Sequence, residues 1–291
     1  MQDLYSYGLL LTSAIMFSVM FYFKDLFRIH YGSGVKATLV SNLGGSIFGL
    51  IILLVINGFV FEFTLFSLIM GLIATINIFL FSFCSLKALG KINLSLYSLF
   101  SMLGGMVLPF VSGIIFHAEP FTLGKAACFV IIIVALCLNV KTGKKGTGTI
   151  FYIGVFVFNG LSGVIAKLYQ ALPFEKISSA GFSILKSLIS IAVASFLLIF
   201  IKGEKKKINW QCIVSMAGTG ILNHLANWLV LVALFTLPVS VQYPFITGGT
   251  IIVSTIISLF TDKKPSKREV ISVVLAFIGI LPLLNSSFDF I

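Results

Sequence analysis

Four polar or amphipathic side chains lie close together within the apolar stretch 210–236: Asn223, His224, Asn227 and Trp228. At 100° per residue they cover a helical arc of about 140°. Two carboxamides and an imidazole need several hydrogen-bond partners where water is excluded. The spacing predicts the wall of a cavity that binds a small polar molecule, and the alternative is a hydrogen-bond network that only holds helices together.

Two other apolar stretches carry polar faces of the same kind. Stretch 240–260 presents Gln242, Tyr243, Thr247, Thr250 and Ser254, and stretch 93–116 presents Tyr97, Ser98, Ser101 and Ser112. The aromatic rings of Phe17, Tyr97, Trp228 and Tyr243 can stack on a planar ligand or hold a cation. Asn77 and Asn159 complete the candidate substrate-binding set. The alternative is interhelical packing, because Ser and Thr commonly serve that role in membrane helices.

Lys186 lies within the apolar stretch 178–201, roughly 13 Å from its outer end at 1.5 Å per residue. An ammonium group at that depth needs a partner, a cavity or a changed protonation state. It can receive an anionic group of a substrate, take part in proton coupling, or pair with a carbonyl group. His224 is the better candidate for a coupling proton, because imidazole titrates near physiological pH.

The sequence lacks the residue patterns of the common enzyme classes. It has no Ser-His-Asp set, no His, Asp and Glu cluster at metal-ligand spacing, and "KTGKKGTG" at 141–148 does not fit the phosphate-binding loop. The four cysteines show no C-x-x-C spacing. We therefore expect no enzyme activity, no catalytic residues, no metal and no cofactor.

The composition indicates an integral membrane protein. Hydrophobic residues make up 58% of the 291 residues, and charged residues only 10%, against about 25% in soluble domains. The mean hydropathy is +1.12. The net charge of +11 lies mostly in short junctions between apolar runs, which favours contact with lipid headgroups over nucleic acid. The first apolar run lacks a basic leader, so we interpret it as a span and not as a signal peptide.

Ten apolar runs are long enough to cross a bilayer as helices. They cover approximately 4–23, 35–56, 64–86, 93–116, 122–140, 150–170, 178–201, 210–236, 240–260 and 270–285. The sequence thus predicts an all-α membrane protein with ten transmembrane helices around a central cavity.

The second half of the sequence repeats the first at an offset of 144 to 146 residues. Gly8 falls on Gly154, and the pair Gly104 and Gly105 falls on Gly248 and Gly249. Five spans per unit, an odd number, make this an inverted repeat. The units are residues 1–140 and 150–291, with a basic linker at 141–149. The paired glycines indicate close helix crossing, or a hinge beside the recurring Tyr97 and Tyr243.

Basic residues predict the orientation. Sixteen of the twenty Lys and Arg residues flank the loops after spans 1, 3, 5, 7 and 9, whereas only Lys125, Lys167 and Lys176 lie at the other face. Because basic loops stay in the cytoplasm, both termini are expected outside the cell membrane.

Two stretches carry a family resemblance. They are "FHAEPFTLGKAACFVIIIVALCL" at 116–138 and "FSILKSL" around Lys186, in the order set by the repeat. The chain resembles the drug/metabolite transporter superfamily, in its ten-helix EamA-type branch, over essentially its whole length. The resemblance implies that helices 1, 3, 4, 6, 8 and 9 surround the cavity. Family members usually keep both termini in the cytoplasm, the reverse of the charge-based prediction.

These observations favour a secondary transporter in the cell membrane. Its substrate would be a small organic metabolite, such as an amino acid, a nucleobase-like compound or an amphipathic cation, moved by alternating access at a midplane site. A flippase or transporter for a lipid-linked or nucleotide-sugar substrate is the alternative, and a membrane enzyme or sensor is a third possibility. We expect a small-molecule substrate and the bilayer as partners, no nucleic acid, and a monomer, with a dimer left open.

Overall fold

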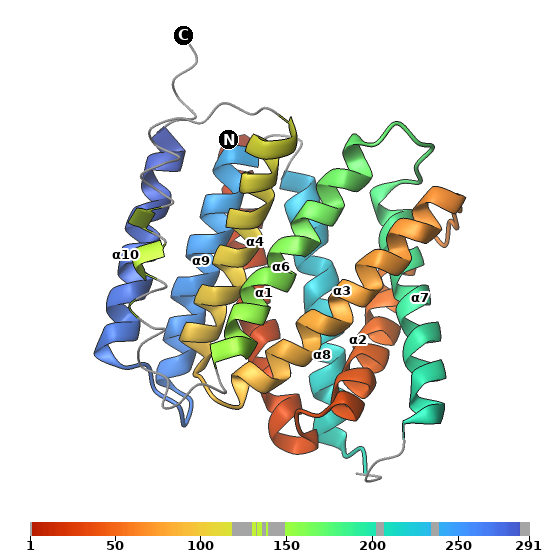
Figure 1. Cartoon of the computed structure of the whole chain (residues 1–291), viewed down its shortest axis with the longest axis horizontal. Helices are drawn as coiled ribbons and strands as arrows, with labels where there is room; N and C mark the ends of the chain where they lie inside the picture. The colour runs from red at the N-terminus through yellow and green to blue at the C-terminus, as the bar shows by residue number, and fades with distance from the viewer. Residues whose placement is uncertain are drawn as a thin grey trace.

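The protein is an all-helical bundle throughout the residues that the computed structural model describes, which are 2–117, 130–131, 133–135, 138, 149–201, 207–233 and 239–285 (Figure 1). The helices are α1 (Gln2–Tyr31), α2 (Val35–Ile56), α3 (Leu65–Leu89), α4 (Leu94–His117), α6 (Thr149–Ala171), α7 (Ser179–Phe200), α8 (Trp210–Ala233), α9 (Val239–Leu259) and α10 (Lys267–Asn285). The prediction of an all-α fold is confirmed for these residues.

Five of the described helices are long and apolar enough to cross a membrane. They lie at Tyr5–Tyr31, Val35–Ile56, Leu65–Leu89, Thr149–Tyr169 and Ser179–Phe200. Shorter apolar helical stretches occur at Leu94–Pro109 and Phe245–Leu259. These helices make the chain a multi-pass helical membrane protein. Most of the predicted span 122–140, and all of the linker 141–149 except residue 149, fall outside the described residues.

Side chains on the bundle surface are apolar, and many side chains inside it are small and polar. Ile51, Val55 and Ile76 are each more than half exposed, whereas Ser18 and Ser98 have no exposed surface. Exposed aliphatic groups suit hydrocarbon, because lipid tails have no polar group to solvate. Small interior residues let helix backbones approach closely.

The first helix is longer than the sequence predicted. We expected the span to end at residue 23, yet α1 continues to Tyr31. Lys24 is buried with its Nζ 4.4 Å from the centroid of the Phe81 ring, and Arg28 forms a salt bridge of 2.6 Å with Asp25 one turn earlier. Charged residues with such partners do not interrupt a helix, so the expected break was placed about two turns too early.

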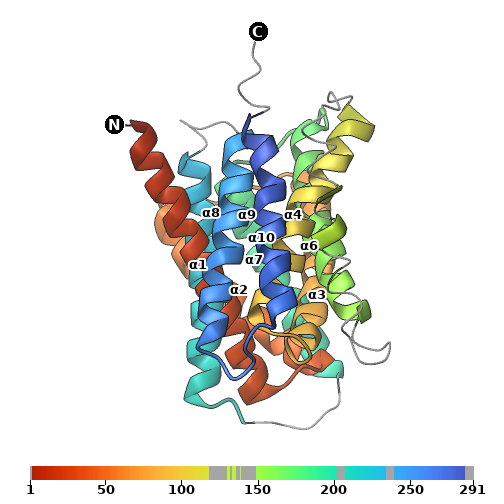
Figure 2. The same cartoon turned by 90° about the vertical axis from the view of Figure 1, so that its left-hand side faces the viewer.

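The helices pack in pairs that join the two halves of the chain. α1 packs on α8 and α9, α6 packs on α3 and α4, α2 packs on α7 and α8, and α4 packs on α9. α3 also contacts α7, and α10 lies against α9 and α4 (Figure 2). No half of the chain therefore forms a separate core within the described residues.

The bundle has two ends that differ in charge. At the lower end in Figures 1 and 2, α3 meets α4 and α9 meets α10, and the connections there carry Lys91, Lys263 and Lys264. We call this the basic end. The start of α1, the α2–α3 and α6–α7 connections and the end of α10 lie at the opposite end.

Candidate functional site

Of the polar side chains of α8, some are exposed and one, His224, faces α2. Asn227 donates a hydrogen bond of 2.6 Å to the carbonyl oxygen of Asn223, and both Asn227 and Trp228 are exposed. His224 is turned instead toward α2, where its ring occupies the place that a side chain at Gly49 would need. Its Nδ1 lies 2.8 Å from the carbonyl oxygen of Gly220. An exposed carboxamide on a membrane helix favours a ligand or water as its neighbour.

Lys186 lies on α7, which packs on α2, as α8 does. Its Nζ is 4.9 Å from the centroid of the Phe182 ring, one turn earlier on α7. Ser190, one turn after Lys186, bonds to Ser46 of α2, and the His224 ring lies against Gly49, three residues after Ser46. Because α2 and α7 run in opposite directions, Lys186 and His224, which the sequence suggested as a coupling or anion site, lie at the same level of α2.

The Phe182 ring that Lys186 contacts is also part of an aromatic stack. Tyr169 stacks on Phe182 with a centroid distance of 4.0 Å, and Phe66 stacks on Tyr169 at 5.5 Å. The Tyr169 hydroxyl is 2.9 Å from the Ser67 hydroxyl and bonds with the backbone of Ile177. These rings fix the α3, α6 and α7 helices around Lys186.

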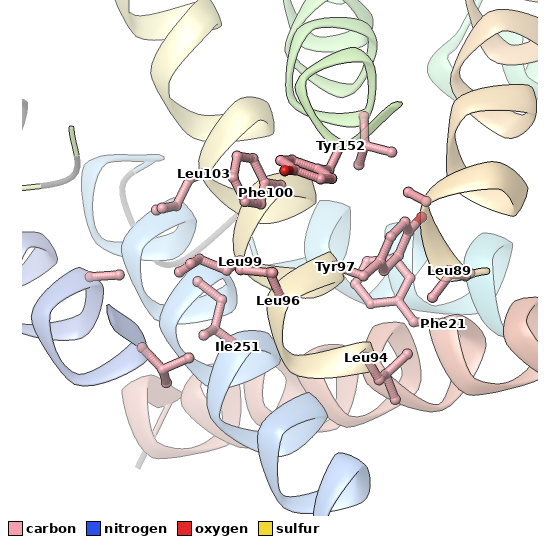
Figure 3. Close-up of a cluster of buried hydrophobic side chains, with 14 of the residues drawn as sticks. Phe21, Leu89, Leu94, Leu96, Tyr97, Leu99, Phe100, Leu103, Tyr152 and Ile251 are labelled. Carbon is pink, nitrogen blue, oxygen red and sulfur yellow. The ribbon is translucent and has the colours of Figure 1, made fainter. Parts of the chain in front are cut away.

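Tyr97 belongs to a cluster of buried apolar side chains from several helices near the basic end, which we call the apolar layer. It has no exposed surface, its ring meets Phe21 edge-on at 5.0 Å, and its hydroxyl donates a hydrogen bond of 2.9 Å to Ser85 (Figure 3). Phe17 packs against the same layer. Ser98 donates within its own helix to the carbonyl oxygen of Ser95.

Tyr97 and the polar face of α8 are linked through α1. Tyr97 meets Phe21 of α1, and the ring of Phe23, two residues later, occupies the place that a side chain at Gly218 of α8 would need. Leu222, the neighbour of Asn223 on α8, packs against the same apolar cluster as Tyr97.

Asn77 and Asn159 join helices to one another. Asn77 Nδ2 donates to the Phe158 carbonyl oxygen at 2.9 Å and to the Ser162 hydroxyl at 2.8 Å, which ties α3 to α6. Asn159 Nδ2 donates to the Ser101 carbonyl oxygen at 2.6 Å, which ties α6 to α4. The amide groups of both residues are thus engaged in interhelical bonds.

The predicted residues of α9 are only partly described. Thr247 is buried beside Gly248. Gln242 and Tyr243 lie on α9, but their side chains are outside the part of the chain that the structure describes.

The glycine pairs lie at helix contacts of different closeness. A Cβ atom at Gly104 would collide with the backbone of Phe156 on α6, and one at Gly105 would press on the Asn159 amide. A Cβ atom at Gly248 would meet only the Phe277 ring at 3.0 Å, and one at Gly249 the Cβ of Ala14 at 3.0 Å. The α4–α6 contact is a backbone approach, whereas α9 meets side chains.

A third close approach, between α2 and α8, was not predicted from the sequence. A Cβ atom at Gly220 of α8 would collide with the backbone of Gly45 on α2, and one at Gly44 would collide with Met216. The adjacent glycines Gly44 and Gly45 were the available signal, since glycine pairs elsewhere in the chain were noted.

Hydrogen bonds also join the halves of the chain at both ends of the bundle. At the basic end, Lys263 Nζ donates to the Leu89 carbonyl oxygen at 2.6 Å. Burial, followed by the charge of Arg28, lowers the pKa of Lys263. At the opposite end, the Ser178 backbone N–H and hydroxyl donate to the Glu62 carboxylate at 2.6 and 2.7 Å. The backbone bond, followed by the hydroxyl bond, lowers the pKa of Glu62.

Comparison with known proteins relates the chain to a fold. No protein-family model matches the sequence, and no curated protein matches it. The solved crystal structure of another protein aligns with 98% of this chain and 98% of its own length, with a TM-score of 0.60 and 12% sequence identity. At that identity the likeness concerns the fold alone. The fold and the polar interior define a multi-pass helical membrane protein.

Proposed function

We propose that the protein is a secondary transporter of a small organic metabolite, of the drug/metabolite transporter kind. In this proposal, ten spans form two inverted repeats, residues 1–140 and 150–291, and the substrate binds between them. An amino acid, a nucleobase-like compound or an amphipathic cation would be moved by alternating access. Inverted repeats commonly place a substrate site at the midplane of their interface.

The observation that carries this proposal is that the packed helix pairs remain packed pairs when the helices of the two halves are exchanged. When each helix of the first half is matched with the helix five places later, the α1–α8 contact becomes α6–α3, and α4–α6 becomes α9–α1. Each of these pairs packs together, and α2–α7 and α4–α9 are pairs of counterparts. Such a pattern is typical of two units related by a two-fold axis.

The ends of α4 and α6 support a tenth span. α4 ends at the opposite end of the bundle and α6 begins at the basic end (Figures 1 and 2). The chain between them therefore has to return along the length of the bundle. A span at 122–140 would accomplish this, and both termini would then lie at the same side.

The two halves of the bundle suggest the state of the transport cycle. The apolar layer around Tyr97 and the bond from Lys263 to Leu89 join the helices at the basic end. Asn227 and Trp228 lie beyond that layer and are exposed. We propose that this conformation is closed toward the basic end and receives substrate from the opposite end.

A binding screen followed by transport tests this proposal. The purified full chain would be screened by thermal shift with amino acids, nucleosides, quaternary amines and nucleotide sugars, and each hit tested by counterflow in liposomes. We expect a hit that exchanges, and whose shift is lost in Asn223→Ala and Asn227→Ala. Asn57→Ala is the matched control, because Asn57 lies in the α2–α3 connection and its amide bonds only locally to Val60. A screen in which no stabilising compound exchanges would show that the proposal is wrong.

A further inference from the structure

Lys186 is a cation with no acidic partner among the helices that surround it. The sequences of α2, α3, α6, α7 and α8 contain no Asp or Glu. Within the described residues, the Nζ contacts the Phe182 ring but makes no hydrogen bond. A ring face attracts an ammonium group but accepts no full hydrogen bond, so its three donors lack acceptors.

The groups nearest to Lys186 offer further donors. Because the Gly220 carbonyl oxygen can only accept, the proton of the bond to His224 is carried by Nδ1. One turn after Lys186 on α7, the Ser190 hydroxyl accepts a hydrogen bond of 2.9 Å from Ser46 on α2. The Ser46 proton is committed to this bond, and the Ser190 proton is left to donate elsewhere.

Asn42 repeats the same situation on the other helix. It precedes Ser46 by four residues, as Lys186 precedes Ser190 by four, so each residue lies on the helix face that carries the serine. Asn42 Nδ2 is buried and has no hydrogen-bond partner. Buried donors are nearly always paired in folded proteins. The α2–α7 seam, which we define by Asn42, Ser46, Lys186 and Ser190, therefore carries two unpaired donors. Because α2 and α7 run in opposite directions, these donors lie on opposite sides of the Ser46–Ser190 bond, about 12 Å apart along the bundle, and only Lys186 lies at the level of His224.

We propose that the α2–α7 seam binds the carboxylate group of a small monoanionic substrate, with the carboxylate held by Lys186 beside His224. An ionised carboxylate is an acceptor-only group, which fits a set of side chains that offer mainly donors. One ammonium group balances one negative charge, whereas a phosphate group carries up to two. This inference rests on the proposed transport function, since it names the substrate class, but binding can be measured without transport.

The competing explanation is a lysine kept only for packing against Phe182. Lys24 provides the comparison within the same protein, because its Nζ also lies over a ring, that of Phe81 at 4.4 Å. Lys24 shares α1 with Asp25, however, and lies close to the charged residues of the basic end. Unlike Lys24, Lys186 lies on a helix without acidic residues, α7, which packs on two further helices without acidic residues, α2 and α3.

Thermal shift of the purified full chain in detergent tests the proposal. The probes are acetate, pyruvate and benzoate at 1 to 50 mM, with benzamide as the uncharged counterpart of benzoate. We expect at least one carboxylate to raise the melting temperature in a saturable way, and benzamide to leave it unchanged. Lys186→Met should weaken that response at least tenfold, and Lys186→Arg should retain it. Lys24→Met is the matched control and should respond as the wild type does.

Each contrary result has a definite meaning. If Lys186→Met does not fold, Lys186→Gln replaces it, because Gln keeps a donor but removes the charge. A carboxylate response that survives both the Met and Gln variants would overturn the proposal, as would an equal response to benzamide or no response to any of the three carboxylates. Carboxylate binding without counterflow would contradict only the proposed transport function. Counterflow of a neutral compound that carboxylates do not inhibit would contradict only the proposed carboxylate site at the seam.

Discussion

Ser46 Oγ donates a hydrogen bond of 2.9 Å to Ser190 Oγ, and the two serines are separated by 144 residues, the offset predicted for the sequence repeat. In the proposed arrangement, the bond joins counterpart positions of the two units at the place where α2 packs on α7. A two-fold axis, if present, passes close to this bond.

The first prediction concerns that bond. Ser46→Ala and Ser190→Ala should each lower stability, and the double variant should lose less than the sum of the two, with a coupling of about 0.6 kcal/mol. Unfolding in mixed detergent measures the cycle. Ser215→Ala is the control partner for Ser190→Ala, because the Ser215 hydroxyl donates to the Gln211 carbonyl oxygen within its own helix, α8. Full additivity for Ser46 and Ser190 would contradict the bond.

Asn77 and Asn227 should give opposite results when each is changed to Ala. Asn77 bonds to α6 at two points, so its loss should lower stability by about 1 kcal/mol. Asn227 is exposed and bonds within its own helix, so its loss should change stability by less than about 0.5 kcal/mol. Transport should be reduced mainly by the Asn227 change. Equal effects of both changes on stability and transport would contradict the assignment of their roles.

Gly104 should tolerate alanine less well than its counterpart Gly248. A methyl group at Gly104 meets the backbone of Phe156, which cannot rotate away, whereas at Gly248 it meets the movable ring of Phe277. We expect Gly104→Ala to destabilise the protein by about 1 to 3 kcal/mol. Gly248→Ala should be near neutral, because the gain in helix propensity offsets the contact. The melting temperatures of the two variants decide the order.

Glu62 should make stability depend on acid pH. Its lowered pKa means that the folded protein stabilises the carboxylate relative to the unfolded chain. This contribution is complete above the ordinary Glu pKa of about 4.3, and it is lost as the pH falls through the lowered folded value. Glu62→Gln should therefore melt below the wild type at pH 7, and the difference should vanish on acidification below about pH 4. Glu175→Gln, a change in the α6–α7 connection, is the control. A constant difference from pH 7 to pH 3 would contradict the role of the charge.

The orientation can be measured with two cysteine variants in a background without native cysteines. Lys207 precedes α8 at the basic end, and Lys176 precedes α7 at the opposite end. The distribution of basic residues predicts a cytoplasmic basic end. In intact cells, a membrane-impermeant maleimide should label Lys176→Cys, and it should label Lys207→Cys only after permeabilisation. The reversed pattern would indicate that both termini are cytoplasmic.

Helix positions could be predicted because apolar runs and turn residues act locally. The predicted span 35–56 coincides with α2 at Val35–Ile56, and 178–201 differs by one residue at each end from α7. The continuation of α1 past residue 23 could not be predicted, because the contact of Lys24 with Phe81, a distant residue, leaves no record in the local sequence. The end of α1 does have a local signal, since Gly32 follows it with φ 110° and donates its N–H to the Arg28 carbonyl oxygen.

The candidate site could be predicted only as a list of polar residues. Helical periodicity placed Asn223 and Asn227 on one face of α8, and they do lie together. Periodicity does not identify the facing helix, so it could not distinguish the interhelical bond of Asn77 from the exposed amide of Asn227. Nor could it place Lys186 at the level of His224, since that depends on how α7 and α8 meet α2.

The bond between Glu62 and Ser178 links the order of synthesis to the structure. Ser178 is the N-cap of α7, and the carboxylate that holds it belongs to a residue 116 positions earlier. Because the ribosome delivers the chain from its N-terminus, Glu62 has already been synthesised when Ser178 emerges. The acceptor for the first turn of α7 is thus already present when α7 is made, and the contact can form as soon as the start of α7 has been synthesised.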